Sequence, residues 1–225
     1  SYDDYLRYNT MAISKIALHE CPDAALFDCE LSRDVLLFCR KNLIKTVYVL
    51  RIPTPERFAA IKNDLALFDL IIVPHREDEF PPDQTKWLSK LHAVFVGPIV
   101  DLAEAPSVCH RQNILITLGS GARIEANLPL FSEVNAFLEY LRNSNSMIDG
   151  ERVVIDIVTG PFYDGGCNLN GFPFRSSTDS LARDMYAAKV VVSGAGYNTI
   201  NEILKTKTPA VVVPLSRRWD DQFRR

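Results

Sequence analysis

Hydrophobic and polar positions follow two patterns that alternate along the chain. Short, almost wholly apolar runs indicate buried strands, whereas segments with apolar residues three or four positions apart indicate helices. The predicted strands cover residues 24–28, 46–50, 70–73, 93–96, 114–118, 153–158, 190–193 and 210–214. The predicted helices cover residues 5–19, 32–42, 55–67, 125–141, 178–187 and 199–204. Since apolar strands alternate with helices, the pattern predicts an α/β fold whose parallel sheets are covered on both faces.

The alternating series is interrupted once. Residues 98–112 contain Pro98 and Pro106 and follow neither pattern, so we interpret them as a linker. This division gives an N-terminal lobe over 1–97 and a C-terminal lobe over 113–225. A chain of 225 residues is long enough for two such lobes. We therefore expect two Rossmann-like lobes with a cleft between them.

Composition and charge exclude several classes of protein. The chain is 47% hydrophobic and 24% charged, which is ordinary for a globular protein. A net charge of -3 provides no bulk attraction to nucleic acid or to an anionic membrane, so neither is expected as a partner. No apolar run is long enough for a transmembrane segment. The five cysteines have no C-x-x-C spacing, and we interpret them as reduced thiols of a cytoplasmic protein.

Two glycine-rich turns follow predicted strands of the C-terminal lobe, at residues 119–121 and 194–199. Ligands of an open parallel sheet bind beyond the carboxyl ends of its strands. Glycine lets the backbone approach a phosphate closely, and the N–H groups at the start of the next helix favour an anion. The two turns are therefore candidates for phosphate binding. The alternative is that both are simply tight connections between a strand and a helix.

The second turn does not match the dinucleotide fingerprint. Gly194 and Gly196 fit its first half, but Thr199 stands in place of the third glycine. The next strand, over 210–215, also lacks the expected acidic residue. A P-loop is absent as well, because no glycine precedes Lys-Ser or Lys-Thr at the required spacing. A nicotinamide-dependent enzyme is therefore disfavoured.

Polar residues beyond the second turn are candidates for the rest of a nucleotide. Thr199 and Glu202 are three residues apart in a predicted helix and so share one side, where a carboxylate could accept both ribose hydroxyls. The alternative is a capping box formed by the same two residues. Asp221 and Gln222 follow the last predicted strand and should emerge at the same edge. The alternative for them is a solvated polar loop.

The order of these motifs resembles the C-terminal lobe of GT-B glycosyltransferases, and it is most similar to family 28. The series is G-S-G-A, M-Y-A-A, V-S-G-A-G-Y-N-T-I-N-E, T-P-A-V-V-V-P and D-D-Q, and the resemblance covers residues 113–222. It implies a GT-B-like fold with an incomplete N-terminal lobe. The implied activity is metal-independent transfer of a hexosyl or N-acetylhexosaminyl group from a UDP-sugar to an unknown acceptor. The nucleotide sugar would be a substrate, and no cofactor is implied.

The resemblance also assigns positions along the donor. The diphosphate would lie along the two turns, the ribose against Glu202, and the donor sugar against the D-Q pair. The implied donor-binding residues are Gly119, Ser120, Gly121, Ser193, Gly194, Ala195, Gly196, Asn198, Thr199, Glu202, Asp221 and Gln222. The loop before Met185 would meet the base largely through its backbone. Helix N-termini and basic groups would offset the charge on the leaving diphosphate.

The catalytic base is harder to place. In the family, a strand and a glycine-rich turn open the N-terminal lobe, often with a histidine as general base, whereas this sequence begins at Ser1, after that point. Asp28 and Glu30 follow a predicted strand and are the candidate catalytic residues, because acid–base chemistry needs a carboxylate at the reacting hydroxyl. The alternative is that they cap the helix that begins near Ser32. The four histidines show no metal-ligand spacing, so no metal site is expected.

Two other functions fit the same motifs. A nucleotide-sugar hydrolase or 2-epimerase would share the diphosphate-binding turn but would act without an acceptor. A non-catalytic fragment would bind a nucleotide sugar with negligible turnover.

Overall fold

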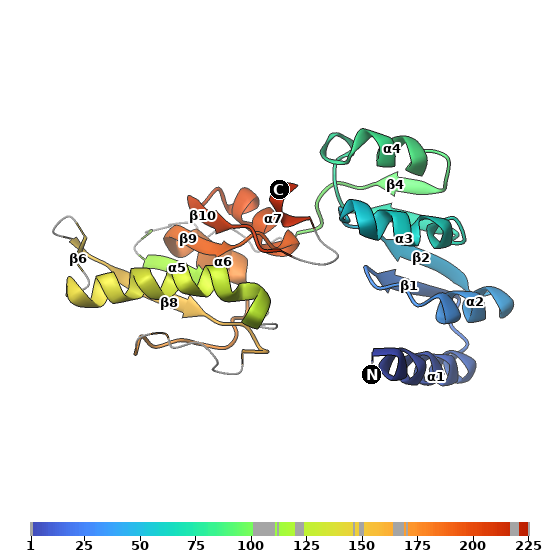
Figure 1. Cartoon of the computed structure of the whole chain (residues 1–225), viewed down its shortest axis with the longest axis horizontal. Coiled ribbons are helices and arrows are strands. Elements are labelled where there is room, and N and C mark those ends of the chain that lie inside the picture. Colours follow the sequence, from blue (N-terminus) through green and yellow to red (C-terminus); the bar gives the residue numbers. More distant parts are fainter. Residues whose placement is uncertain are drawn as a thin grey trace. The chain divides into compact units, whose positions relative to one another are not determined.

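The computed structural model describes residues 2–100, 111, 113–119, 124–145, 147–148, 151–163, 169, 171–216 and 221–224. The chain divides into two compact units, one within Ser1–Pro98 and one that begins at Ile99 and holds the remaining described residues. Each unit is built around a parallel sheet (Figure 1). In the described part of the chain, no helix combines the length and the apolar character needed to cross a membrane.

The N-terminal unit contains a four-stranded parallel sheet in the order β1-β2-β3-β4. Its strands are β1 (Ala24–Asp28), β2 (Lys45–Val49), β3 (Leu70–Val73) and β4 (Ala93–Phe95). Its helices are α1 (Tyr2–Glu20), α2 (Arg33–Lys41), α3 (Pro55–Leu65), the 3-10 helix η1 (Glu77–Glu79) and α4 (Pro82–Leu88). Because the described strands lie in sequence order, every connection between them steps in the same direction, and their order does not reverse.

Local signals explain where the predicted helices of this unit begin. The Ser32 hydroxyl accepts a hydrogen bond from the Val35 N–H and caps α2, and the Thr54 hydroxyl accepts from the Arg57 N–H and caps α3. Pro55 occupies the first turn of α3, where its missing N–H costs nothing. The short helices η1 and α4 were not predicted, because each is too short to repeat an apolar pattern.

The C-terminal unit contains a second four-stranded parallel sheet, in the order β10-β9-β5-β8. Its strands are β5 (Asn113–Thr117), β8 (Val154–Val158), β9 (Ala188–Gly194) and β10 (Ala210–Val213). Its helices are α5 (Ile124–Asn143), α6 (Leu181–Ala187), α7 (Tyr197–Thr206) and the 3-10 helix η2 (Gln222–Arg224). The short antiparallel pair β6 (Met147–Ile148) and β7 (Glu151–Arg152) was not predicted, because two-residue strands have no readable alternation.

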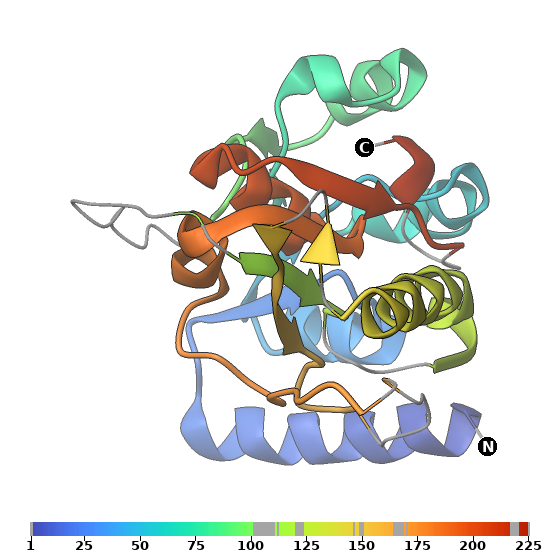
Figure 2. The same ribbon diagram turned by 90° about the vertical axis from the view of Figure 1, so that its left-hand side faces the viewer.

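Helices cover both faces of this second sheet (Figure 2). On one face, Phe131 and Leu138 of α5 pack with Ile116 of β5. On the other face, Met185 of α6 and residues of α7 pack with Leu115, the neighbour of Ile116 in β5. Successive strand residues point to opposite faces, so β5 is buried on both sides. The C-terminal unit is therefore a doubly wound α/β sheet of the predicted Rossmann-like kind.

Candidate functional site

The two glycine-rich turns begin side by side at one edge of the C-terminal sheet. Strands β5 and β9 are parallel neighbours, and Thr117 lies opposite Ser193 in their register. The chain leaves β5 toward α5 on one face of the sheet and leaves β9 toward α7 on the other. The strand order therefore reverses between β5 and β9, which is the position where open α/β sheets bind ligands. The structure thus brings the starts of the two predicted turns together.

The first turn depends on the backbone of Gly119. This residue has a φ of 67°, in the left-handed region that favours glycine. Its N–H donates a hydrogen bond of 3.4 Å to the hydroxyl of Thr117. Apart from its chain neighbours, no atom of the described residues lies within 4 Å of the position that a Cβ would take. Ser120 and Gly121, which were predicted to line the same turn, lie outside the described residues.

The second turn begins with a buried hydroxyl. Ser193, near the end of β9, is only 1% exposed, and among the described residues its Oγ has no hydrogen-bond partner. A buried hydroxyl in this state costs roughly 1–3 kcal/mol. Gly194 follows, and a Cβ built there would lie 3.0 Å from Cδ1 of the buried Leu215. A side chain at position 194 would therefore crowd Leu215 in the segment after β10.

Helix α7 begins earlier than the sequence indicated. Its N-cap is Gly196, which has no side chain to accept a hydrogen bond from the first turn of the helix. The partial positive charge of the helix N-terminus and its N–H groups therefore lie beside the second turn. Thr199 is the third residue of the helix, so the alternative of a capping box with Thr199 as N-cap is wrong. Ala195 and Thr199 are buried.

Two of the remaining predicted residues lie on or beside the exposed start of this helix. Asn198, the second residue of α7, is exposed, and Glu202, the sixth, is half-buried. Tyr197, which sequence reasoning missed, is buried, and its hydroxyl accepts a 3.0 Å hydrogen bond from the N–H of Ile99. These two residues are 98 positions apart, so no local pattern could have revealed the contact.

Asp221 and Gln222 follow the last strand, as predicted. Gln222 is buried, and its Oε1 accepts a 3.1 Å hydrogen bond from the N–H of Leu215. Since Leu215 packs against Gly194, this bond ties the segment after β10 to the second turn. The side chain of Gln222 therefore has a structural role of its own. Asp221 is half-buried beside it.

The loop before α6 contains a network of charges that the sequence did not reveal. Arg175 donates from Nε and Nη2 to the two carboxylate oxygens of Asp156, at 3.1 and 2.7 Å. Its Nη2 also lies 2.8 Å from the carboxylate of Asp184, which accepts a further 2.6 Å hydrogen bond from Thr178. The hydrogen bonds to Asp156 are the main cause that raises the pKa of Arg175, so this side chain stays charged.

The two candidate catalytic residues lie at the end of β1, which is an edge strand. Asp28 is its last residue, with a carboxylate 3.4 Å from Nη2 of Arg51. Glu30 is exposed. The N-cap of α2 is Ser32, so neither acid fills the capping position that was the alternative interpretation. The order of the described strands does not reverse beside β1, so the strand order gives no support of its own for a ligand site at these two acids.

The residue between the two acids is conformationally unusual. Cys29 has a φ of 62°, and its carbonyl accepts a 2.9 Å hydrogen bond from the buried Tyr48 hydroxyl. Burial raises the pKa of the Cys29 thiol to about 12, so it is not a nucleophile at neutral pH.

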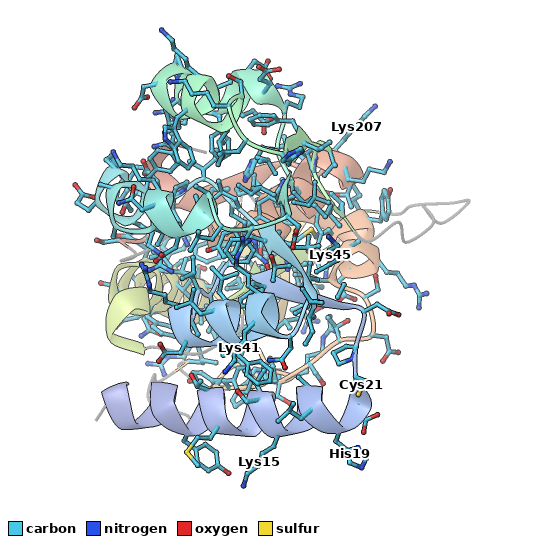
Figure 3. The ribbon with its side chains drawn as sticks, turned by 90° about the vertical axis from the view of Figure 1, so that its right-hand side faces the viewer. Lys15, His19, Cys21, Lys41, Lys45 and Lys207 are labelled. Carbon is cyan, nitrogen blue, oxygen red and sulfur yellow. The ribbon has the colours of Figure 1, made fainter. Side chains whose placement is uncertain are left out.

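The described histidines take structural or surface positions. His75 is buried. Its Nε2 accepts a hydrogen bond from the Ile52 N–H, and its Nδ1 lies 3.3 Å from the Glu79 carboxylate. His19 lies near the exposed end of α1, beside Cys21 (Figure 3). Throughout the described ranges, no group of three or more His, Cys, Asp or Glu side chains is placed to hold a metal ion.

Comparison with known proteins agrees with the C-terminal motifs. Residues 150–224 match the family model of the glycosyltransferase family 28 C-terminal domain. The resemblance predicted from the order of the motifs is thereby confirmed over these residues. No sequence among the curated proteins matches the chain.

The solved structures with a similar fold include the following three proteins. The glycosyltransferase of kitacinnamycin has a TM-score of 0.58 at 15% identity, over 95% of this chain and 62% of that one. UGT2 of Phytolacca americana, complexed with UDP-2fluoro-glucose and pterostilbene, has a TM-score of 0.58 at 14% identity, over 97% and 62%. A protein assigned as a UDP-N-acetylglucosamine 2-epimerase from Listeria monocytogenes has a TM-score of 0.57 at 11% identity, over 97% and 64%.

These likenesses define the fold. The chain is an α/β protein with two parallel four-stranded sheets that match the Rossmann-like lobes of GT-B proteins, as the sequence predicted. It spans less than two thirds of the length of each of these structures.

Proposed function

We propose that the chain is a glycosyltransferase that binds a UDP-sugar at the carboxyl edge of its C-terminal sheet and transfers the sugar to an acceptor. The observation that carries this proposal is the register of Thr117 opposite Ser193. That register sets the starts of the two glycine-rich turns side by side where the strand order reverses. The second of these turns lies within the stretch that matches the family 28 C-terminal domain.

The diphosphate of the donor is the part that this edge suits best. The Ser193 hydroxyl is buried and has no partner among the described residues, so a phosphate oxygen would give it the hydrogen bond it lacks. The N-terminus of α7 starts three residues later and favours an anion. At the start of the facing turn, Gly119 has no side chain that would block the approach of a phosphate. Three independent features at one edge therefore support the same ligand.

The ribose and the sugar would extend from this diphosphate. Glu202 is on the first turns of α7 and half-buried, which suits a carboxylate that accepts ribose hydroxyls. Asp221 and Gln222 follow β10, the strand next to β9, and would contact the hydroxyls of the donor sugar. The loop before Met185 would meet the base.

The reaction would be a direct displacement. An acceptor hydroxyl attacks the anomeric carbon, the bond from that carbon to the diphosphate oxygen breaks, and the acceptor proton passes to a carboxylate. Asp28 and Glu30 are our candidates for that base. The N-terminus of α7 would stabilise the negative charge that develops on the leaving diphosphate, and no metal ion would be needed for this role. Residues 98–112 would link the acceptor-side lobe to this donor lobe.

A second candidate is a nucleotide-sugar 2-epimerase or hydrolase. The likeness to a structure assigned as a 2-epimerase favours it to the extent that the fold is shared. Such an enzyme would release or isomerise the sugar in the absence of an acceptor, whereas a transferase would not. Turnover of UDP-sugars without an acceptor therefore separates the two candidates.

The direct test is calorimetric titration with UDP, UDP-glucose, UDP-N-acetylglucosamine and dTDP-glucose, with and without EDTA. We expect binding that EDTA does not abolish. Ser144→Ala is a matched control, because it removes a serine hydroxyl that bonds the Leu141 carbonyl at the end of α5, away from the carboxyl edge of the sheet. The control should bind like the unmodified chain. The absence of binding to every nucleotide sugar would overturn the proposal.

A further inference from the structure

Arg175 joins strand β8 to helix α6 through its side chain and its own backbone. Its guanidinium forms a two-pronged pair with Asp156 in β8 and also contacts Asp184 in α6. Its N–H donates to the Ile157 carbonyl, and its carbonyl accepts from the Thr159 N–H, each at 3.0 Å. The backbone of Arg175 thus adds a parallel bridge at the end of β8.

This arrangement fixes both ends of a short loop. Residues 176–180 leave the anchored Arg175 and enter α6, where the Ser180 hydroxyl accepts from the Arg183 N–H and caps the helix. Within the loop, Thr178 donates a 2.6 Å hydrogen bond to the same Asp184 oxygen that contacts Arg175. Asp184 therefore ties the middle of the loop to its first residue. The loop has its shape because two carboxylates converge on one guanidinium.

A polar cavity of about 280 Å³ opens beside this network. Its lining includes the hydroxyl-bearing residues Ser177, Thr178 and Ser180, together with Arg183. This volume is just below that of ordinary small-molecule sites, which is roughly 300–1,000 Å³. It suits one ring of a ligand and its polar groups better than a whole nucleotide. The cavity follows the end of β8, and β5 and β9 with their glycine-rich turns end at the same edge of the sheet.

We propose that Arg175 is a positioning residue for the base end of the nucleotide: by joining Asp156 to Asp184 it holds the loop over residues 176–180 in the shape that recognises the base. This inference rests on the proposed function. Arg175 itself does not touch the reacting atoms; it acts through the backbone and hydroxyl groups of the loop. The structural alternative is that the network only stabilises the fold of the unit.

The two roles make different predictions for ligands that lack a base. Arg175→Met removes the charge and all donors but keeps a long apolar stem. If Arg175 positions the loop, this variant should lose about tenfold or more in UDP affinity, because the loop must then be ordered on binding. Its affinity for inorganic pyrophosphate should stay unchanged, and its preference for UDP over ADP should shrink. Arg175→Lys should recover only part of this preference, since an ammonium cannot hold both carboxylates in the same planar geometry.

Calorimetry with UDP, ADP and pyrophosphate measures these ratios, and thermal unfolding confirms that each variant is folded. Arg33→Met is the matched control, because it breaks an arginine–aspartate pair of 2.6 Å with Asp64 in the other unit. If Arg175→Met does not fold, Thr178→Val is the replacement test variant, because it removes one hydrogen bond of the network. An unchanged UDP-to-ADP ratio, or an equal loss for UDP and pyrophosphate, would overturn the inference. Failure of the unmodified chain to bind UDP would instead overturn the proposed function and this inference with it.

Discussion

Thr117 and Ser193 lie opposite each other in the register of β5 and β9, and both side chains are buried. Their hydroxyls are used differently. The Thr117 Oγ1 accepts a hydrogen bond from the Gly119 N–H and so helps to shape the first turn. The Ser193 Oγ has no partner among the described residues. At equivalent positions of one sheet edge, the Thr117 hydroxyl thus stabilises the fold, whereas the Ser193 hydroxyl is suited to bind a ligand.

Ser193→Ala should raise the free energy of unfolding of the ligand-free chain. A buried hydroxyl without a hydrogen bond costs roughly 1–3 kcal/mol, and alanine removes that cost while leaving only a small void. The same substitution should weaken UDP binding by about tenfold or more, because a hydrogen bond to a charged group contributes roughly 1.5–3 kcal/mol. Urea unfolding and calorimetric titration measure the two effects. A variant that is both less stable and unchanged in binding would contradict the assignment.

Thr117→Val is the control for this prediction, and its effect should have the opposite sign. Valine keeps the shape of threonine but removes the acceptor for the Gly119 N–H. We expect a loss of about 1 kcal/mol in the free energy of unfolding, which is the usual net contribution of one hydrogen bond. If both substitutions change stability in the same direction, the contrast between the two hydroxyls is wrong.

Glu202→Gln should reduce discrimination between ribose and deoxyribose. An ionised carboxylate accepts hydrogen bonds from both ribose hydroxyls, whereas an amide offers one oxygen and no charge. We expect UDP affinity to fall by about tenfold, since a charge-assisted hydrogen bond contributes roughly 1.5–3 kcal/mol. The affinity for 2′-deoxy-UDP should fall much less. Equal losses for the two nucleotides, measured by calorimetry, would exclude contact between Glu202 and the 2′-hydroxyl.

Much of the fold could be predicted from the sequence, because parallel strands buried on both faces leave continuous apolar runs. The strand predicted over 24–28 coincides with β1, and the one over 70–73 coincides with β3. The start of α7 was missed by two residues, because Gly196 caps the helix without a side-chain signal, whereas Thr199 resembles an N-cap.

The glycine-rich turns of the candidate site were also readable, because glycine and small polar residues cluster locally after a strand. The ion pairs of Arg175 could not be predicted from the sequence. Asp156 is 19 residues away from Arg175 in the sequence, and only the folded sheet brings their side chains together. Contacts of this kind leave no periodic pattern, so propensity and spacing could not indicate the network around the loop before α6.

Gly194 and Gly119 should tolerate a side chain differently. Gly194→Val should destabilise the C-terminal unit by about 1–3 kcal/mol, because its Cβ would lie 3.0 Å from the buried Leu215 side chain and overpack the site. Gly119→Ala meets no atom of the described residues within 4 Å, so we assign its cost of about 1–2 kcal/mol to the left-handed φ. Gly119→Asn should recover part of that loss, since asparagine adopts this region more readily, whereas Gly194→Asn should not. Thermal unfolding of the four variants separates the two causes.

Asp69 should make the stability of the N-terminal unit depend on pH. Its carboxylate accepts hydrogen bonds from the N–H and the hydroxyl of Thr46, at 2.8 and 2.9 Å, and the bond from the N–H is the main cause that lowers its pKa. In the unfolded chain an aspartate has a pKa of about 3.9. The carboxylate is therefore stabilised by folding, and this contribution is fully present above about pH 3.9. It is lost as the pH falls through the lower pKa of the folded state.

Urea unfolding between about pH 2 and 7 should thus show a steeper loss of stability at acid pH in the unmodified chain than in Asp69→Asn, whose amide does not titrate. Lys45→Met tests the other source of the shift. Lys45, in β2 (Figure 3), lies 3.7 Å from the carboxylate and is mostly exposed, so the ion pair should contribute little. The free energy of unfolding of Lys45→Met should depend on pH in the same way as that of the unmodified chain. A Lys45→Met profile as flat as that of Asp69→Asn would show that the ion pair, and not the hydrogen bonds from Thr46, sets the pKa of Asp69.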